Sequence, residues 1–475
     1  MTTFNTNVLY LLLLTSVMVF GQSENSGLKQ ELSFEEYLAY VKAHHPVMKQ
    51  ANLTLSMGEA SLLKARGGFD PKIEVDYDRK AFKKTTYYDQ LNAAFKVPTW
   101  YGIEFKANFE ENSGAYLNPN LTVPDGGLYS AGVSFSLAQG FLINERMAAL
   151  KQARFFRDQT KADRELLVNN LIFEASTAYF EWLEATNEQN VYEAFLQNAS
   201  TRFKAVERSA ALGEKAMIEV TEARIILKNR ALNPEEASLK RRKAALKVSN
   251  YLWLNTIPLE IQDYAIPVLP AKQNLENSLV LAGITDTIAL LDNHPKLLSI
   301  DAKIGGLTIN RALKQNKLLP KIDLEYHFLS SQFDEINAFN TSNYKAFVNV
   351  SFPILLRKER GDLRLANLKL NEANFERKTI ALNLKNKINA VQAEIQSLAK
   401  QNLLINDIIE DYETMVAAEE RKFFLGESSL FLINAREQKL IDAQIKDNTL
   451  KIKEFIAIAR LYNILGRSLE PVTNN

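Results

Sequence analysis

The residues of this chain that could do chemistry are few, and their spacing does not form a reaction centre. Histidine occurs four times, at His44, His45, His294 and His327. No two of these lie four residues apart, as metal ligands on one face of a helix would. Carboxylates are numerous but scattered, and the sequence GGLTIN at Gly305 lacks the lysine of a phosphate-binding loop. We therefore expect no enzyme activity, no cofactor and no bound metal.

Charge and cysteine content exclude further classes of function. The 475 residues include 57 basic and 56 acidic side chains, so the chain has no basic footprint for a phosphate backbone and no nucleic-acid partner is expected. Cysteine is absent, which excludes disulfides, thiolate metal sites and the lipid attachment of a bacterial lipoprotein. With only 18 Gly and 13 Pro in this length, long uninterrupted elements are favoured.

The N-terminus has the pattern of an export signal. The apolar run 8–20 is too short to span a bilayer, and Val19 and Gly21 have the small-residue spacing of a signal peptidase site. This pattern predicts a signal peptide over 1–21 with cleavage before Gln22, and an uncleaved N-terminal anchor is the alternative. No later stretch reaches the roughly 18 apolar residues of a transmembrane helix.

Two of the histidines are landmarks of an internal repeat. The segments 44–77 and 293–326 align without a gap at an offset of 249, and in both a His-Pro pair is followed by Pro-Lys-Ile and a closing tyrosine. Leu-Gly-Glu triplets at Gly213 and Gly426 align at an offset of 213. The difference places 36 extra residues in the first copy, ahead of Gly140. The chain is therefore predicted to contain two copies of one unit.

In each copy the apolar period changes from helical spacing to alternation. The alternating runs are 73–77, 101–109 and 129–137 in the first copy, and 322–328 and 344–352 in the second. One face of each run is apolar and the other is polar or charged, which suits a barrel with lipid outside and water inside. A half-buried soluble sheet is the alternative. The extra residues are expected to add a hairpin or to lengthen a polar loop at 113–127.

Two stretches without proline predict very long helices. From about Leu142 to Leu212 the chain has neither Gly nor Pro, and at about 1.5 Å per residue such a helix is roughly 105 Å long. A second stretch runs from about Leu363 to Leu425. Helical patterns return for about 40 residues after Gly213 and Gly426, where a positive φ allows a tight reversal. The returning helix covers half of the outgoing one, so the leading helix of each copy is expected to cover the other half.

The order of these elements resembles the TolC family of outer-membrane efflux proteins. The first copy carries the resemblance at His45-Pro46, Pro71, Gly140-Phe141-Leu142-Ile143, Glu145-Arg146, Leu212-Gly213-Glu214 and Ala223-Arg224. The second copy carries it at His294-Pro295, Pro320, Phe352-Pro353, Glu359-Arg360, Leu425-Gly426-Glu427 and Ala435-Arg436. The resemblance covers essentially the whole mature chain, and its specificity lies in the duplicated order rather than in any single motif.

The resemblance implies an α+β membrane protein that serves as the exit duct of a tripartite efflux or type I secretion system. A homotrimer would form a 12-stranded barrel in outer-membrane lipid, with four strands from each chain, and a helical tunnel through the periplasm. The implied parts are a first repeat at 22–256, an equatorial linker at 257–277 and a second repeat at 278–475. The implied partners are a periplasmic adaptor (membrane fusion) protein and an inner-membrane pump. A periplasmic coiled coil or adhesion rod without a pore is the alternative.

The two glycine turns are the expected functional end. The residues expected to meet the adaptor are Leu212, Gly213, Glu214, Leu425, Gly426 and Glu427. The resemblance places an entrance constriction shortly after the second turn, at positions that here hold Phe431 and Asn434, neither of which is charged. We expect packing of Phe431 to close the entrance, and Glu219 and Glu222 to give a mild preference for cations. The alternative is that all four are ordinary inter-helix residues.

Overall fold

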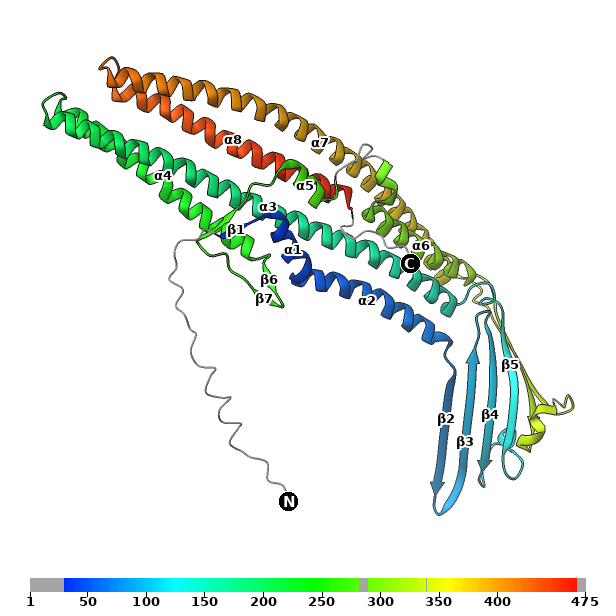
Figure 1. The fold of residues 1–475 in the computed structure, drawn as a ribbon. Helices are drawn as coiled ribbons and strands as arrows, with labels where there is room; N and C mark the ends of the chain where they lie inside the picture. Colours follow the sequence, from blue (N-terminus) through cyan, green and yellow to red (C-terminus); the bar gives the residue numbers. More distant parts are fainter. Residues whose placement is uncertain (1–29, 282–288, 339, 468–475) are drawn as a thin grey trace, which may run out of the picture.

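Long helices run between a six-stranded sheet at one end of the molecule and two tight turns at the other (Figure 1). The computed structural model describes residues 30–281, 289–338 and 340–467, so the predicted signal peptide lies outside the described residues. The helices are α1 (Phe34–His44), α2 (Pro46–Arg66), α3 (Glu145–Ala211), α4 (Met217–Ser249), α5 (Lys272–Ser278), α6 (Pro295–Asn316), α7 (Arg357–Phe424) and α8 (Leu430–Leu465). None of these described helices combines the length and the apolar character needed to cross a membrane.

The large sheet is antiparallel throughout, in the order β10-β9-β5-β4-β3-β2. Its strands are β2 (Lys72–Phe82), β3 (Thr85–Pro98), β4 (Ile103–Ser113), β5 (Leu128–Ala138), β9 (Lys321–Ser330) and β10 (Tyr344–Ser351). Two small sheets near the middle pair β1 (Gln30–Leu32) with β8 (Ala265–Pro267) and β6 (Trp253–Leu254) with β7 (Ile257–Pro258). Both halves of the chain thus follow one order, in which a leading helix, strands, a long helix and a returning helix succeed one another.

The described sheet has six strands, where the resemblance implies four in each chain. The extra residues of the first copy form β3 and β4, a further antiparallel pair between β2 and β5, so that they add strands as well as a loop. In β3, clear alternation is confined to Leu91, Ala93, Phe95 and Val97, and the preceding half of the strand is mostly polar. Because the periodic signal is short, the sequence alone does not separate this strand from a loop.

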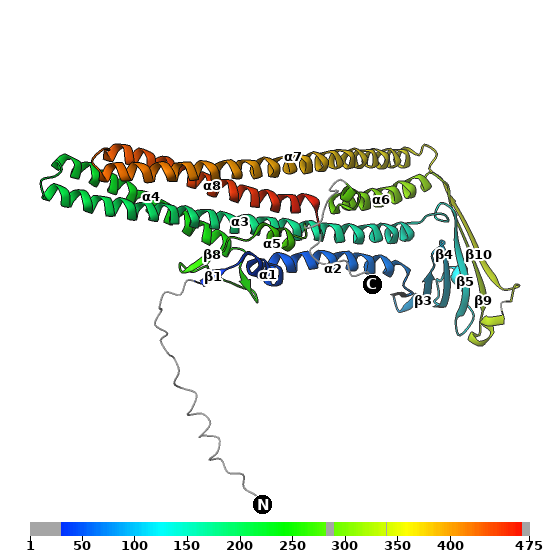
Figure 2. The same ribbon diagram turned by 45° about the horizontal axis from the view of Figure 1, so that its top comes forward.

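Each long helix is covered by two shorter ones laid end to end. Helix α3 has 67 residues and α7 has 68, so each spans roughly 100 Å. Helix α4 packs along the part of α3 nearest the turn, and α2 packs along the part nearest the sheet (Figures 1 and 2). Helices α8 and α6 pack along α7 in the same way. The expected division of each long helix between a leading and a returning partner is confirmed.

The two His-Pro pairs begin helices. His45 Nδ1 accepts a hydrogen bond from the Val47 amide at 3.2 Å, and His294 Nδ1 accepts one from the Lys296 amide at 3.0 Å. A proline follows each histidine at the first position of α2 and α6, where its missing N–H costs nothing. Burial lowers the pKa of His45 and of His294, which favours the neutral form of both imidazoles. The interpretation of the two His-Pro pairs as boundaries at which helices begin is confirmed.

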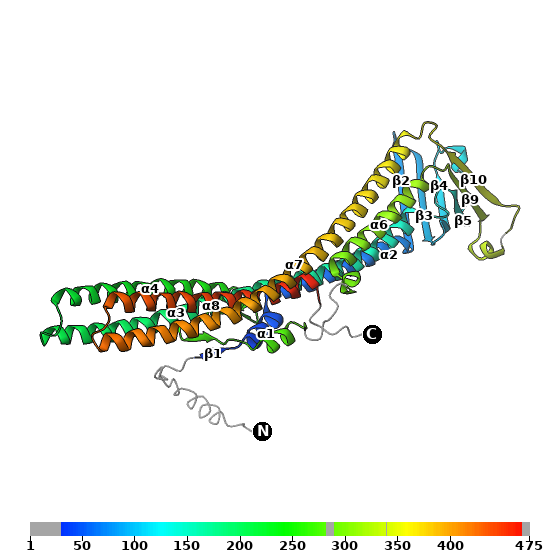
Figure 3. The same cartoon turned by 90° about the horizontal axis from the view of Figure 1, so that it is seen from above.

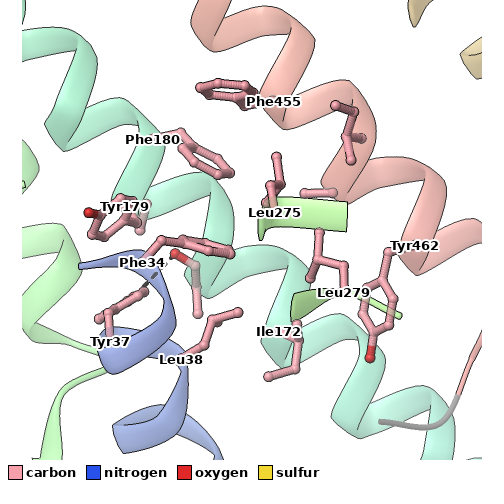
Figure 4. Close-up of a cluster of buried hydrophobic side chains, with 14 of the residues drawn as sticks. Phe34, Tyr37, Leu38, Ile172, Tyr179, Phe180, Leu275, Leu279, Phe455 and Tyr462 are labelled. Carbon is pink, nitrogen blue, oxygen red and sulfur yellow. Dashed lines mark hydrogen bonds between the residues drawn. The ribbon is translucent and has the colours of Figure 1, made fainter. Parts of the chain in front are cut away.

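The main hydrophobic core lies at the middle of the molecule, where α1, α3, α5 and α8 meet (Figure 4). The rings of Phe34 and Phe180 stack with centroids 5.0 Å apart, and those of Tyr37 and Tyr179 with centroids 5.4 Å apart. The Tyr179 hydroxyl donates to a backbone carbonyl of the segment that joins the two copies, that of Val268, at 2.8 Å. This segment is thereby packed around the middle of the helices rather than forming a separate unit.

Candidate functional site

The register of the large sheet collects most of its apolar side chains on one surface, which we call the apolar face. Its members are Ile73, Val75, Tyr77, Leu91, Ala93, Phe95, Val97, Ile103, Phe105, Ala107, Phe109, Tyr129, Ala131, Val133, Phe135, Leu137, Ile322, Leu324, Tyr326, Phe328, Tyr344, Ala346, Val348 and Val350. Ile73 is 76% exposed and Val348 64% exposed, although both would be buried in an ordinary half-covered sheet. A short 3-10 helix, η4 (Phe333–Ala338), packs against β5 and β9.

The opposite surface, which we call the polar face, carries ion pairs and hydrogen bonds between strands. Lys106 Nζ lies 2.6 Å from Glu325 Oε1, and the Ser136 hydroxyl donates to Asp323 Oδ1 at 2.9 Å. Lys345 Nζ lies 3.6 Å from a Glu110 carboxylate oxygen. That last pair joins β10 to β4, which are separated by β9 and β5 in the sheet. The two side chains can meet because the polar face is concave, which brings side chains on distant strands closer together. Figure 3 shows this sheet at the end of the helices.

The two surfaces together fit a wall between lipid and water. Apolar side chains that face outward and paired charges that face inward are the alternation of a transmembrane β-strand, which needs about 9–11 residues. The strands here have 11, 14, 11, 11, 10 and 8 residues. The alternation predicted from the sequence is confirmed in all five runs, although 101–102 and Phe352 lie outside the strands. Strand β3 adds a sixth strand with the same arrangement of faces.

At the far end of the helices, both glycine turns have the same backbone geometry. Gly213 has φ +78° and Gly426 has φ +79°, in the left-handed region. At the first turn the Gly213 amide donates to Ala210 O at 3.0 Å and the Glu214 amide donates to Ser209 O at 3.0 Å, which is the Schellman pattern of a helix end. A Cβ at either glycine would meet no atom within 4 Å, so glycine is needed for its conformation and not for space.

Each tip presents an exposed leucine ahead of its glycine. Leu212 is 69% exposed and Leu425 is 70% exposed, and the neighbouring Phe424 is 79% exposed. Behind the tips, buried side chains from α3, α4, α7 and α8 hold the two hairpins together; they are Val206, Val220, Ala223, Phe423, Leu430 and Ile433. The tip residues expected to contact an adaptor therefore lie at the surface of a region in which the two hairpins pack against each other.

The four expected entrance residues have different surroundings. Phe431 is 68% exposed near the start of α8, and Glu222 is exposed on α4. Asn434 Oδ1 accepts a hydrogen bond from Arg230 Nη2 at 3.3 Å. Glu219 lies 2.7 Å from Lys215 Nζ, and this hydrogen bond lowers the pKa of Glu219. Within one chain, Phe431 and Glu222 are thus exposed, while the other two side chains have partners in their own chain.

Two positions near the second turn also have defined partners. Phe423 is buried, and Lys215 Nζ lies 4.4 Å from the centre of its ring, so a cation from the first hairpin contacts an aromatic residue of the second. The Ser428 hydroxyl donates to Glu419 Oε1 at 2.5 Å. The first contact joins the hairpins, and the second stays within the second hairpin.

A buried group of charged residues lies between the hairpins and is absent from the sequence predictions. Glu437 on α8 is only 1% exposed, and it accepts hydrogen bonds from Arg202 of α3 at 3.2 and 3.3 Å. Arg230 of α4 lies 3.6 Å from the same carboxylate, and Arg202 also pairs with Glu420 of α7 at 3.0 Å. Burial lowers the pKa of Arg230. We call these four residues the inter-hairpin charge cluster.

The sequence does contain a signal for this cluster. Glu437 stands at helical spacing within an apolar series, between Ile433 and Leu440. Arg230 follows Val220 and Ala223 in the same manner on α4. A charged residue in an apolar stripe is buried only when it is paired, so such a position indicates a partner on a neighbouring helix.

Known proteins resemble this chain in structure rather than in overall sequence. No family model matches the sequence, and no curated protein sequence matches it. Solved structures of outer-membrane channels do match. The CmeC outer membrane channel of Campylobacter jejuni has a TM-score of 0.63 at 15% identity, over 91% of this chain and 85% of that one. The outer membrane protein VceC of Vibrio cholerae has a TM-score of 0.64 at 14% identity, over 91% of this chain and 96% of that one.

A third structure gives the same result. The open state of the MtrE outer membrane channel of Neisseria gonorrhoeae has a TM-score of 0.65 at 12% identity, over 91% of this chain and 88% of that one. The chain has the fold of the TolC-type outer-membrane channels. The resemblance predicted from the duplicated landmarks is confirmed for the fold. In this TolC-type fold the candidate wall and the candidate tips lie at opposite ends of the molecule (Figure 2).

Proposed function

We propose that the chain is the outer-membrane exit duct of a tripartite efflux or type I secretion system. The observation that carries this proposal is the six-stranded sheet, which exposes an apolar face, bears paired charges on the other face and continues into helices of roughly 100 Å. Three copies would close their sheets into one barrel in the outer membrane and their helices into a periplasmic tunnel. The duct itself would catalyse no reaction, and the pump would supply the energy.

The proposed partners are a periplasmic adaptor and, through it, an inner-membrane pump. The adaptor would contact the tips, where exposed leucines precede Gly213 and Gly426 and glutamates follow them. Exposed leucines beside glutamates would offer apolar contacts surrounded by charge, which suits a helical partner. The proposed domain boundaries at 22–256, 257–277 and 278–475 fit the repeated order of elements.

The entrance of the duct would lie at the same tips. Phe431 is exposed in one chain, so three copies could bring three rings to a constriction. The charge of Glu219 is balanced by Lys215 at 2.7 Å, which leaves Glu222 as the better candidate for a cation preference. Asn434 would support the constriction through its bond to Arg230.

A bilayer measurement tests the proposal. The full chain, expressed with its export signal in a Gram-negative host, is expected in the outer-membrane fraction as a trimer that resists detergent. In planar bilayers this trimer should conduct ions in discrete single-channel steps. A water-soluble chain that gives no conductance would instead support the alternative of a periplasmic rod, for which the exposed apolar face has no use.

A further inference from the structure

The large sheet has two open edges. Every residue of β2 and every residue of β10 is exposed, and these strands stand at opposite ends of the strand order. In the described chain these two strands do not pair with each other. Unpaired backbone groups along a strand edge are strongly unfavourable in hydrocarbon, so a sheet that faces lipid needs both edges covered.

The number of strands decides how the edges can be covered. Six antiparallel strands make β2 and β10 run in opposite directions, so β10 of one copy can lie antiparallel to β2 of the next. Repeating this junction leaves no free edge. Building on the trimer of the proposed function, we propose that three copies of this chain join head to tail through β10 and β2 into an 18-stranded barrel, with Val350 of one copy opposite Ile73 of the next.

The first constraint on the register between β10 and β2 is that the apolar face must continue from one copy to the next. Ile73 and Val350 both belong to the apolar face and both lie at the end of the sheet nearest the helices. A shift of one residue would turn a whole strand to the wrong side, so only shifts in steps of two keep the apolar face continuous. In three such registers the ends of β2 and β10 nearest the helices lie at about the same height along the barrel. These registers place Ile73 opposite Val348, Val350 or Phe352.

Strand tilt removes one of these registers. A row of paired residues runs across one sheet from Ile73 to Tyr344. Pairing the next copy's Ile73 with Val350, six residues beyond Tyr344, gives a rise of one residue per strand. That rise corresponds to a tilt of about 35°, within the usual range for barrels. Pairing with Val348 gives about 25°, below that range, whereas pairing with Phe352 gives about 43°.

Charge on the polar face separates the two remaining registers. With Val350 opposite Ile73, Lys345 lies directly opposite Asp78 of the next copy, and opposite charges in such a pair are stabilising. With Phe352 opposite Ile73, Lys345 lies opposite Lys80, and like charges are destabilising. The junction with Val350 also pairs all eight residues of β10 with 72–79, so the shorter edge is fully covered.

The consequence is a wide barrel. At this tilt, 18 strands give a backbone diameter of about 33 Å, compared with about 22 Å for 12 strands. The added width comes from β3 and β4, which the 36 extra residues of the first copy supply. These extra residues add no α-helix to the chain, so the wider barrel would be joined to a helical tunnel that is not widened.

Engineered disulfides test the junction, and the natural chain contains no cysteine to interfere. The first double variant is Val75→Cys with Val348→Cys on the apolar face, and the second is Glu74→Cys with Asn349→Cys on the polar face. Antiparallel neighbours alternate between wide and narrow pairs, so one of these two variants holds the narrow pair that a disulfide can join. Mild oxidation of the assembled protein should then convert most of the chain into covalent trimers on denaturing gels.

Matched variants test the neighbouring register. Tyr77→Cys with Val348→Cys and Asp76→Cys with Asn349→Cys would lie opposite each other only in the register that pairs Phe352 with Ile73. We expect them to cross-link at least tenfold less than the first two variants. A trimer that conducts ions but cross-links in none of these variants would overturn the junction and leave the proposed function intact. A protein that forms neither trimers nor channels would overturn the proposed function itself.

A measurement on the unmodified protein covers the case in which the variants do not assemble. Electron cryomicroscopy of the detergent-purified trimer should show 18 strands around the barrel, with β10 of each copy beside β2 of the next. A barrel of 12 strands, with β3 and β4 outside the wall, would overturn the proposal.

Discussion

Replacing Glu437 with glutamine should loosen the tips without disturbing the sheet. The substitution keeps the shape of the side chain and removes its charge. Arg202 and Arg230 would then be left close together with no buried carboxylate between them. Glu420 remains as a partner of Arg202, but it is 39% exposed and belongs to α7 only.

The size of the effect follows from burial. The side chain of Glu437 is 1% exposed and that of Arg230 is 6% exposed, so water cannot take the place of the missing charge. Removing one partner of a buried ion pair costs about 3–5 kcal/mol. Because Arg202 keeps its bond to Glu420, we expect the lower end, about 3 kcal/mol, which corresponds to roughly 150-fold in an opening equilibrium.

Amide hydrogen exchange of the detergent-solubilised trimer measures this opening directly. Peptides within 195–245 and 415–445 should exchange about 100-fold faster in the Glu437→Gln variant than in the parent protein, while peptides of the sheet exchange as before. Glu394→Gln is the matched control. It breaks the pair between α7 and α8 in which Arg460 lies 2.7 Å from Glu394, but both side chains are 40% exposed.

The control should cost at most about 1 kcal/mol and change exchange less than about fivefold. The reasoning would be refuted if Glu437→Gln and the parent protein exchanged equally at the tips. It would also be refuted if the two glutamine variants gave the same small effect, because burial would then not decide the strength of the pair.

Four further outcomes are expected. Gly213→Val combined with Gly426→Val should strain each turn by about 1–3 kcal/mol, since both glycines have positive φ, and should weaken transport without preventing insertion; wild-type transport would contradict this. Phe431→Ala should raise single-channel conductance, because three rings leave the constriction at once, and unchanged conductance would place the constriction elsewhere. Deleting 116–125 from the polar loop between β4 and β5 should leave trimer yield and conductance unchanged, and loss of the trimer would contradict its assignment to a loop that assembly does not require. Burial lowers the pKa of His294 in the folded chain, so the unfolded chain binds a proton first and stability falls as pH drops below about 6.5; thermal melting at pH 7.5 and 5.5 should show a smaller acid loss for His294→Asn than for the parent.

Local features of the molecule could be predicted from the sequence because they depend on neighbouring residues. The length of α3 follows from 67 consecutive residues without Gly or Pro, and its end follows from Gly213, which alone can take the required φ without strain. The starts of α2 and α6 follow from two His-Pro pairs whose side chains bond within two residues. Alternation in β4, β5, β9 and β10 likewise shows which side chains share a face.

Only the tertiary structure decided which distant segments meet. The place of β3 in the sheet depends on pairing with β2 and β4, since its own alternation covers only its last half. The burial of Glu437 depends on Arg202, 235 positions earlier in the chain, and on Arg230. The partners of Glu219 and Asn434, and the exposure of Phe431, likewise depend on how the two hairpins pack. A periodic pattern predicts that a face will be covered. The energy of a buried charge or of an open strand edge depends on which segment covers it, and only folding brings that segment near.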